Sequence, residues 1–463
     1  MKKKIFFFSL SLFSAVAVVA QTSQPLYLDE SQPIEVRVQD ALSRMTLEEK
    51  VKLCTAQSKF SSHGVPRLGI PELWMSDGPH GVREEILWDS WGVAGFTNDS
   101  CTAFPALTCL AATWNPEMSA LYGKSIGEEA RYRRKDVLLA PGCNIYRTPF
   151  NGRNFEYLGE DPYLASVMVV PYVQELQKNG VAACVKHFAL NNQEKWRGHI
   201  DVDLSDRALY EIYLPAFKAA VQKGGAWSIM GAYNKIRGTH ACHNDLLLNR
   251  ILKGEWQFDG CVITDWGGAH DTREAVFNGL DIEMGTYTDG VAKNRDFAYD
   301  NYYLAKDYLK GLKDGTYPVS TVDEKAARIL RLIFRTAMNR NRPWGSFTSE
   351  THYNAARRIG EEGIVLLKNE PVKSQKSPLL PIDASKYEKI LVVGDNATRY
   401  LSGGVGATTL KVKQDILPLE TLQEMYGDKI TYTMKADALN GLLDIRRDMQ
   451  PVNLDMARST GPK

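Results

Sequence analysis

Short apolar runs alternate with longer amphipathic segments between about residues 40 and 290, and this alternation constrains the fold most. The apolar runs are short enough for strands, and segments between them, such as 206–222 with Ser205 or Asp206 as N-cap, repeat apolar residues at helical spacing. The runs lie at 72–76, 136–140, 182–186, 227–230 and 261–264, with a weaker sixth at 280–284. Strands that alternate with helices over roughly 250 residues predict a parallel sheet closed into a (β/α)8-type, TIM-like barrel.

Charge and composition exclude several functional classes. The chain has 463 residues, and its 56 Lys and Arg nearly balance 55 Asp and Glu, for a formal charge of +1. This balance gives no reason to expect a nucleic acid or a membrane surface as partner. The length is sufficient for two or three domains.

The N-terminus resembles an export signal. Three lysines at positions 2–4 precede the uncharged segment 5–20, and small residues end at Ala20 before Gln21. This apolar run is shorter than the roughly 20 residues of a membrane-spanning helix. We therefore expect a signal peptide at 1–20, cleavage near Ala20-Gln21, and a periplasmic or extracellular mature protein without a membrane segment.

The segment after the predicted barrel is organised differently. Helices are predicted at 302–312, 321–340 and 353–362, an apolar run at 364–367, and a proline-rich connection at 371–381. An apolar run at 389–393 then starts a new α/β pattern. The predicted domains are a barrel with helical connector at 21–345, a linker segment at 346–383, and an incomplete α/β sandwich domain at 384–463.

Polar residues gather after the predicted strands. Asp77, the pair Lys186-His187, Tyr233 and Asp265 each stand at the end of a separate run. A barrel would bring them together at the carboxyl ends of its strands. Nearby arginines and aromatic residues favour a sugar ligand, since charged groups bind hydroxyls and an indole covers the apolar face of a pyranose.

Cofactor and metal sites are not predicted. The chain has no phosphate-binding Gly-Lys-Ser/Thr loop, and the glycine run at 403–407 lacks the third glycine of a dinucleotide site. The cluster His240-Ala241-Cys242-His243 matches no common zinc spacing and is expected to pack a loop. Of the seven cysteines, Cys184 and Cys261 are expected to be buried, and pairing of Cys101 with Cys109 stays open.

Several motifs resemble glycoside hydrolase family 3, in particular its β-glucosidase branch. The barrel motifs are SDGPHGVR at 76–83, GRNFEYLGEDP at 152–162, KHFALNNQEKWR at 186–197, MGAYN at 230–234 and VITDW at 262–266. LLKN at 366–369, VGDNA at 393–397 and the glycine pair at 403–404 resemble the start of the family's second, α/β sandwich domain. The resemblance covers most of the chain and implies a retaining exo-β-glycosidase.

The resemblance also implies roles for individual residues. Asp265 would be the nucleophile that forms a glycosyl-enzyme. Asp77 would hold the O4 and O6 hydroxyls. Arg153, Lys186 and His187 would bind the middle hydroxyls, Arg83 and Arg197 would orient carboxylates and sugar, Tyr233 would lie against the nucleophile, and Met230 and Trp266 would form apolar walls. Glu156, Glu160 and Asp161 are expected to stabilise a loop instead.

The acid/base is the missing element of this pattern. In one branch of the family a His-Asp pair follows the Lys-His-Phe motif, but here the chain continues as Ala189-Leu190-Asn191-Asn192. The other branch takes a Glu from the second domain, and neither Glu420 nor Glu424 fits its context. We therefore expect that this chain lacks the acid/base and resembles a truncated product, which puts its turnover in question.

The predicted function is hydrolysis of terminal non-reducing β-D-glucosyl residues, with a β-linked oligosaccharide or glucoside as substrate. Three alternatives remain open at this stage. The first is a β-xylosidase or another exo-β-glycosidase of the same family. The second is a sugar-binding protein without turnover. The third is an unrelated barrel lyase or aldolase that uses Lys186 as a Schiff base.

Overall fold

A computed structural model describes residues 24–285, 301–371, 376–404 and 406–434. The predicted signal peptide and most of the C-terminal tail lie outside the described residues. Within the described ranges, no helix is both long enough and apolar enough to cross a membrane.

Five parallel strands form the main sheet. In spatial order they are β1 (Met75–Asp77), β2 (Val137–Leu139), β3 (Ala182–Phe188), β5 (Ser228–Gly231) and β8 (Cys261–Thr264). Each matches one of the five apolar runs, and every residue of these strands is buried. Buried on both faces, they read as continuous apolar runs rather than as alternating ones.

Three bridged segments close this sheet into a ring. The weak sixth run is joined to β8 by one bridge, at Ile282, and its Glu283 pairs in parallel with Thr55. Ala56 pairs with Ser62, and Ser61 with Trp74 beside β1, both antiparallel. The ring thus has five strands and three short bridged segments, and the segment at 61–62 runs against its neighbours. The predicted TIM-like barrel is confirmed, with this local departure from a uniform parallel ring.

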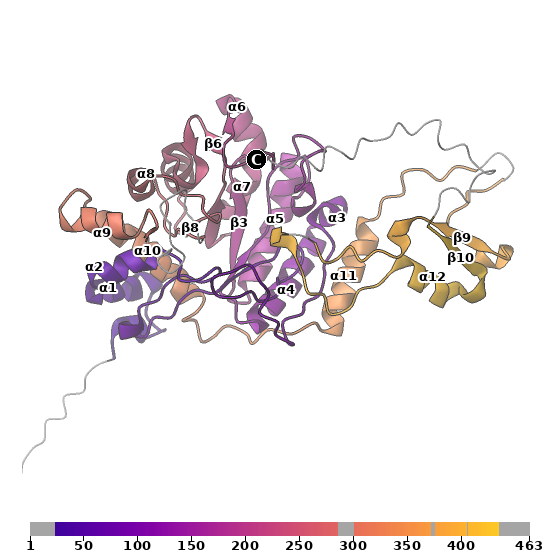
Figure 1. The fold of residues 1–463 in the computed structure, drawn as a ribbon, viewed down its shortest axis with the longest axis horizontal. Helices are drawn as coiled ribbons and strands as arrows, with labels where there is room; N and C mark the ends of the chain where they lie inside the picture. The colour runs from indigo at the N-terminus through magenta and orange to yellow at the C-terminus, as the bar shows by residue number, and fades with distance from the viewer. Residues whose placement is uncertain (1–23, 286–300, 372–375, 405, 435–463) are drawn as a thin grey trace, which may run out of the picture.

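Helices pack around the ring, as Figure 1 shows. The largest contacts join α4 (Pro116–Tyr132) to α5 (Pro162–Gln177) and α5 to α7 (Pro215–Gln222). The other helices and short strands are α1 (Ile34–Arg44), α2 (Leu47–Leu53), α3 (Leu107–Ala112), α6 (Asp206–Ala208), α8 (Thr272–Phe277), α9 (Lys306–Lys313), α10 (Val319–Arg335), α11 (Glu350–Gly363), α12 (Pro418–Tyr426), β4 (Asp201–Val202), β6 (Lys235–Ile236) and β7 (Thr239–His240).

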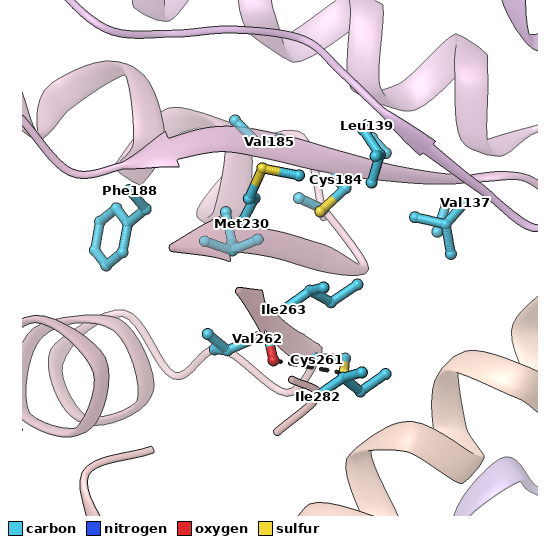
Figure 2. Close-up of a cluster of buried hydrophobic side chains, with 14 of the residues drawn as sticks. Val137, Leu139, Cys184, Val185, Phe188, Met230, Cys261, Val262, Ile263 and Ile282 are labelled. Carbon is cyan, nitrogen blue, oxygen red and sulfur yellow. Dashed lines mark hydrogen bonds between the residues drawn. The ribbon is translucent and has the colours of Figure 1, made fainter. Parts of the chain in front are cut away.

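The barrel interior is apolar and includes two of the cysteines. Figure 2 shows Cys184 and Cys261 among side chains of β2, β3, β5 and β8. Both are fully buried free thiols, as predicted, and desolvation raises the pKa of each. Cys101 and Cys109 are also free thiols in this structure.

The helix predicted over 206–222 is interrupted. Ser205 caps α6 by accepting a hydrogen bond from the Ala208 amide, but residues Leu209–Tyr213 form a π-helical turn before α7. Pro215 is the physical reason, because its nitrogen cannot donate the i to i−4 hydrogen bond that a continuous α-helix requires. The helix predicted over 321–340 also has other ends in the structure, where α10 begins at Val319 and ends at Arg335.

Helix α11 lies inside the segment predicted as a linker, and it packs on the barrel side. It contacts α3 and α4, and its Ala355 and Ile359 are buried. His352 anchors it, with Nε2 2.9 Å from Glu128 Oε2 and Nδ1 2.9 Å from Glu129 Oε1. The first part of 346–383 therefore contains a helix that packs on α3 and α4 of the barrel. The apolar run at 364–367 is exposed and has no regular secondary structure.

The His352 contacts predict a pH-dependent stability. Burial lowers the pKa of this imidazole, but the hydrogen bonds and charges of Glu129 and Glu128 outweigh it and raise the pKa above the ordinary 6.5. A raised pKa in the folded state means that the stabilisation is fully present below pH 6.5 and is lost as pH rises through the folded value. We expect the thermal unfolding temperature to fall as the pH rises from 6.5 through the pKa of His352 in the folded state.

The matched test uses two histidine variants. His352→Gln is expected to cost about 3 kcal/mol near pH 6, since it removes the imidazolium that contacts both the buried Glu129 and the half-buried Glu128, and to flatten the pH slope. His199→Gln, at an exposed position, is expected to preserve both stability and slope. An unchanged slope in the His352 variant would show that the ion pairs do not carry the effect.

The C-terminal part of the described chain is a small β-α-β unit. Strands β9 (Ile390–Val393) and β10 (Ile430–Thr433) pair in parallel, with α12 between them in sequence. Figure 1 shows this unit at one end of the molecule, away from the barrel helices. The sequence predicts the start of a second α/β domain in this part of the chain, and that domain boundary stays a prediction.

Candidate active site

One cavity of about 450 Å³ lies at the carboxyl ends of the barrel strands. The site residues predicted from the sequence all line it, and they come from the ends of several strands and from loops nearby. They are Asp77, Arg83, Arg153, Lys186, His187, Arg197, Met230, Tyr233, Asp265 and Trp266. The barrel thus brings together residues that are up to 189 positions apart in sequence.

Asp265 directly follows β8 and is 9% exposed. Its Oδ1 accepts a hydrogen bond of 2.8 Å from the Trp266 amide, and its Oδ2 lies 3.7 Å from His187 Nε2. Gly267 adopts φ +77°, a conformation that favours glycine, and turns the chain so that the Gly268 amide donates to the Asp265 carbonyl. This turn fixes the carboxylate at the base of the cavity.

Arg153 and Glu156 form a buried pair beside His187. Two hydrogen bonds, of 2.7 and 3.0 Å, join the guanidinium to the carboxylate. Burial raises the pKa of Glu156, but the hydrogen bond and charge of Arg153, with Lys186 nearby, outweigh it and give a lowered pKa. Glu156 is therefore an anion that orients Arg153, in line with the predicted structural role, and it also lines the cavity.

His187 is held in one neutral form by its neighbours. Arg153 Nη2 lies 3.0 Å from Nε2, and Tyr157 OH lies 3.1 Å from Nδ1. Because a guanidinium only donates, Nε2 accepts and the ring proton is assigned to Nδ1. Burial, followed by the charge of Arg153 and other cations, holds the pKa of His187 well below its ordinary value. The His187–Asp265 approach is therefore not an ion pair.

Asp77 forms a second charged group across the cavity. It accepts a 3.0 Å hydrogen bond from Arg83, and Lys186 Nζ lies 3.9 Å from its Oδ1 and 4.0 Å from Glu156 Oε2. Burial raises the pKa of Asp77, and the two cations oppose that shift. This network holds a carboxylate acceptor and an ammonium donor at separations that suit neighbouring hydroxyls of one sugar ring.

Tyr233 and Arg197 form the side of the cavity next to Asp265. The Tyr233 hydroxyl donates a 3.0 Å hydrogen bond to the Trp266 carbonyl, and burial and the Asp265 charge raise its pKa well above the ordinary value. The hydroxyl therefore stays protonated. The Arg197 guanidinium lies 4.6 Å from the Tyr233 ring centroid and donates to Glu194 Oε2 at 2.6 Å, rather than to Asp265.

Sequence reasoning missed part of the aromatic wall. Phe60 lies 5.3 Å from Trp266 and 5.9 Å from Trp91, centroid to centroid, and both Phe60 and Trp91 line the cavity with Phe155. Trp91 is carried by a hairpin in which Ile86 pairs with Val93. In the sequence, Trp88 and Trp91 stand on either side of the pair Asp89-Ser90. Two tryptophans so close together in a loop are a signal that could have identified it.

A segment that follows β9 in the sequence also reaches the cavity. Gly406 and Ala407 line it, and the segment around them is hydrogen-bonded to a barrel loop. The Cys101 amide donates to the Lys411 carbonyl at 2.9 Å, the Lys413 amide donates back to the Cys101 carbonyl, and Lys411 forms an ion pair with Asp99. We call residues 402–404 and 406–413 the docking segment.

Comparison with known proteins identifies the architecture. Residues 43–332 match the family model described as the glycosyl hydrolase family 3 N terminal domain. The chain belongs to glycosyl hydrolase family 3. Its predicted resemblance to this family is therefore confirmed.

The family 3 relatives are named for activity on glycosides. The chain is 68% identical to beta-glucosidase BoGH3A of Bacteroides ovatus, over 91% of this chain and 57% of the relative. An exo-alpha-(1->6)-L-arabinopyranosidase of Bifidobacterium longum is 35% identical, over 78% of this chain and 46% of the relative. Among solved structures, beta-glucosidase 3B of Thermotoga neapolitana in complex with glucose has a TM-score of 0.74 and 33% identity, covering 86% of this chain and 55% of that one. The chain thus spans about half the length of the relatives that it matches.

The histidine cluster lies behind this family 3 site. His240 stacks on His270 with centroids 3.7 Å apart, and its Nδ1 lies 3.0 Å from the Tyr233 carbonyl. His243 Nδ1 lies 2.7 Å from Glu274, and burial and the other two histidines lower the pKa of His243 to about 3. Within the described ranges, no group of three or more potential ligands could hold a metal ion.

Proposed function

We propose that the protein is a retaining exo-β-glycosidase that removes terminal non-reducing β-D-glucosyl residues, with Asp265 as nucleophile. The observation that carries this proposal is the single cavity in which Asp265 faces the Asp77–Lys186–Arg153 network. Fixed charges of both signs suit the hydroxyls of one pyranose, and Trp266 with Phe60 supplies an apolar wall. The beta-glucosidase names of its relatives support the same substrate class.

The chemistry proceeds in two displacements. A carboxylate oxygen of Asp265 attacks the anomeric carbon, a C–O bond forms, and the glycosidic C–O bond breaks with its electron pair on the aglycone oxygen. Water then attacks the same carbon, gives its proton to a base, and releases the sugar and the carboxylate. The net configuration is retained because each displacement inverts it.

Leaving-group protonation limits the substrates. A natural disaccharide needs a general acid, whereas an aryl glucoside with an acidic phenol needs little protonation. Glu156 cannot supply this proton, because Arg153 holds it as an anion. We therefore expect activated aryl glucosides to react faster than cellobiose.

The experiment combines rate and stereochemistry. With 4-nitrophenyl β-D-glucoside, proton NMR is expected to show β-glucose as the first product, and the β-xyloside is expected to react more slowly. First release of α-glucose would refute retention. Tight glucose binding without any nitrophenol release would favour the sugar-binding alternative. A faster xyloside would favour the xylosidase alternative.

The Schiff-base alternative is disfavoured by the surroundings of Lys186. Its Nζ lies between the carboxylates of Asp77 and Glu156 rather than in an apolar pocket. Such surroundings suit an ion-paired donor to hydroxyls rather than a nucleophilic amine. Borohydride trapping with a carbonyl substrate is expected to give no adduct at Lys186.

We also propose that the protein is exported. The basic residues 2–4 and the uncharged segment 5–20 support cleavage before Gln21. The intact mass of the protein from a cell envelope or medium fraction is expected to correspond to a chain that starts at Gln21. A cytoplasmic chain that retains Met1 would contradict this proposal.

A further inference from the structure

A second cavity lies at the opposite end of the barrel from the active site. It has a volume of about 840 Å³. Trp74 immediately precedes β1 and Lys135 lies two residues before β2, while Arg342 donates to the carbonyl of Gly180, just before β3. The cavity therefore opens at the amino ends of these strands, whereas the active site lies at their carboxyl ends.

This cavity is strongly basic, although the whole chain is nearly neutral. Its acids, Glu85 and Asp99, already have cationic partners. Glu85 is bound by Arg133 and Lys135, and Asp99 by Lys411. The five cations that line the cavity are Arg131, Arg133, Arg134, Lys135 and Arg342. They outnumber its two acids by three.

Two guanidinium groups of this cavity, those of Arg131 and Arg134, form no ion pair with a carboxylate within the described ranges. Arg342 pairs with the buried Asp136 at 2.8 Å, whereas Arg131, among the described residues, donates to the neutral carbonyl of Pro343. Burial, then the charges of Arg342 and Arg134, lower the pKa of Arg131. The Arg134 side chain makes no ion pair with any residue in the described ranges. Such a group of like charges is stabilised by a bound anion.

Aromatic side chains border these arginines. Trp344 is 88% exposed, and Tyr132, which stacks on Phe347 at 5.1 Å, is 46% exposed. Trp74 forms part of the wall under Lys135. An open indole face beside guanidinium groups can cover the apolar face of a pyranose while the arginines bind its acid group.

We propose that this cavity binds an acidic sugar, with the carboxylate held by Arg131, Arg134 and Arg342 and the ring against Trp344. The site is separate from the active site, and it does not depend on the proposed glucosidase activity. The basic cavity would hold a uronic-acid unit of a glycan. The active site, at the carboxyl ends of the strands, would stay free to bind a neutral terminal sugar.

The test measures binding of methyl β-D-glucuronide to the chain by calorimetry, in the presence of excess glucose that fills the active site. Binding is expected to persist with glucose present. It is expected to weaken roughly tenfold or more in Arg131→Gln and in Arg134→Gln, since each removes a charge-assisted contact. Arg207→Gln, which removes an equally charged but remote and exposed arginine, is expected to leave the affinity unchanged.

Further arms identify what the site recognises. Trp344→Ala is expected to weaken glucuronide binding and to leave binding of inorganic phosphate unchanged. Phosphate that binds as tightly as the glucuronide would overturn the sugar assignment. Displacement of the glucuronide by glucose, unchanged affinity in both arginine variants, or absence of glucuronide binding would overturn the site itself. Unfolding temperatures of the variants that match the parent show that a lost affinity is not a lost fold.

Discussion

Asp265→Asn is expected to lower kcat for an aryl β-glucoside on the order of 10⁴-fold or more, because an amide cannot form the glycosyl-enzyme. The substitution is nearly isosteric, and its side-chain oxygen still accepts the hydrogen bond from the Trp266 amide. Glucose affinity is expected to change little, since the hydroxyl-binding network around Asp77 and Arg153 is unaltered.

A covalent label distinguishes a lost nucleophile from a damaged pocket. A 2-deoxy-2-fluoroglucoside with a good leaving group is expected to label the parent on Asp265, as peptide mass spectrometry would show, and to leave the Asn variant unlabelled. Asp203→Asn, at an exposed position, is the control and is expected to retain both label and activity. A label on another carboxylate would remove the assignment.

Asp77→Asn is expected to lower kcat/KM for the aryl glucoside by roughly 10²- to 10⁴-fold. The substitution removes a charged acceptor for sugar hydroxyls and leaves the buried cations Arg83 and Lys186 without that carboxylate. A charge-assisted hydrogen bond contributes roughly 1.5–3 kcal/mol, and two hydroxyls are involved, which gives this range.

The xyloside provides the internal comparison for Asp77. A xyloside lacks the O6 hydroxyl, so its kcat/KM is expected to fall by a smaller factor than that of the glucoside. An equal loss for both substrates would mean that Asp77 does not contact O6. Since the variant also disturbs a buried ion pair, its thermal unfolding must be measured, and a loss of fold alone would affect both substrates alike.

Strand ends are the part of this site that sequence predicts well. Apolar runs with both faces buried stand out clearly, and the polar residue after each run, such as Asp77 or Asp265, must lie at one end of the barrel. The motif resemblance then adds the loop residues Arg153 and Arg197. For this reason each predicted site residue lines the cavity.

Other features depend on contacts that no local pattern encodes. Phe60 and Trp91 reach the cavity because the reversed segment at 61–62 pairs with Trp74, and single bridges leave no periodic signal. The position of α11 follows from His352 meeting two carboxylates on a helix more than 200 residues away in sequence. The π-helical turn before Pro215 shows how one missing amide hydrogen interrupts a helix that the apolar spacing predicts as continuous.

The docking segment has a consequence for the order of events during synthesis. The last ring segment of the barrel ends near Glu283, and Gly406 follows about 120 residues later. At translation rates of roughly 5–20 residues per second, the charged base of the cavity emerges on the order of ten seconds before the wall that Gly406 and Ala407 provide. During that interval the nascent barrel presents its sugar-binding groups in a more open cleft than the finished protein does.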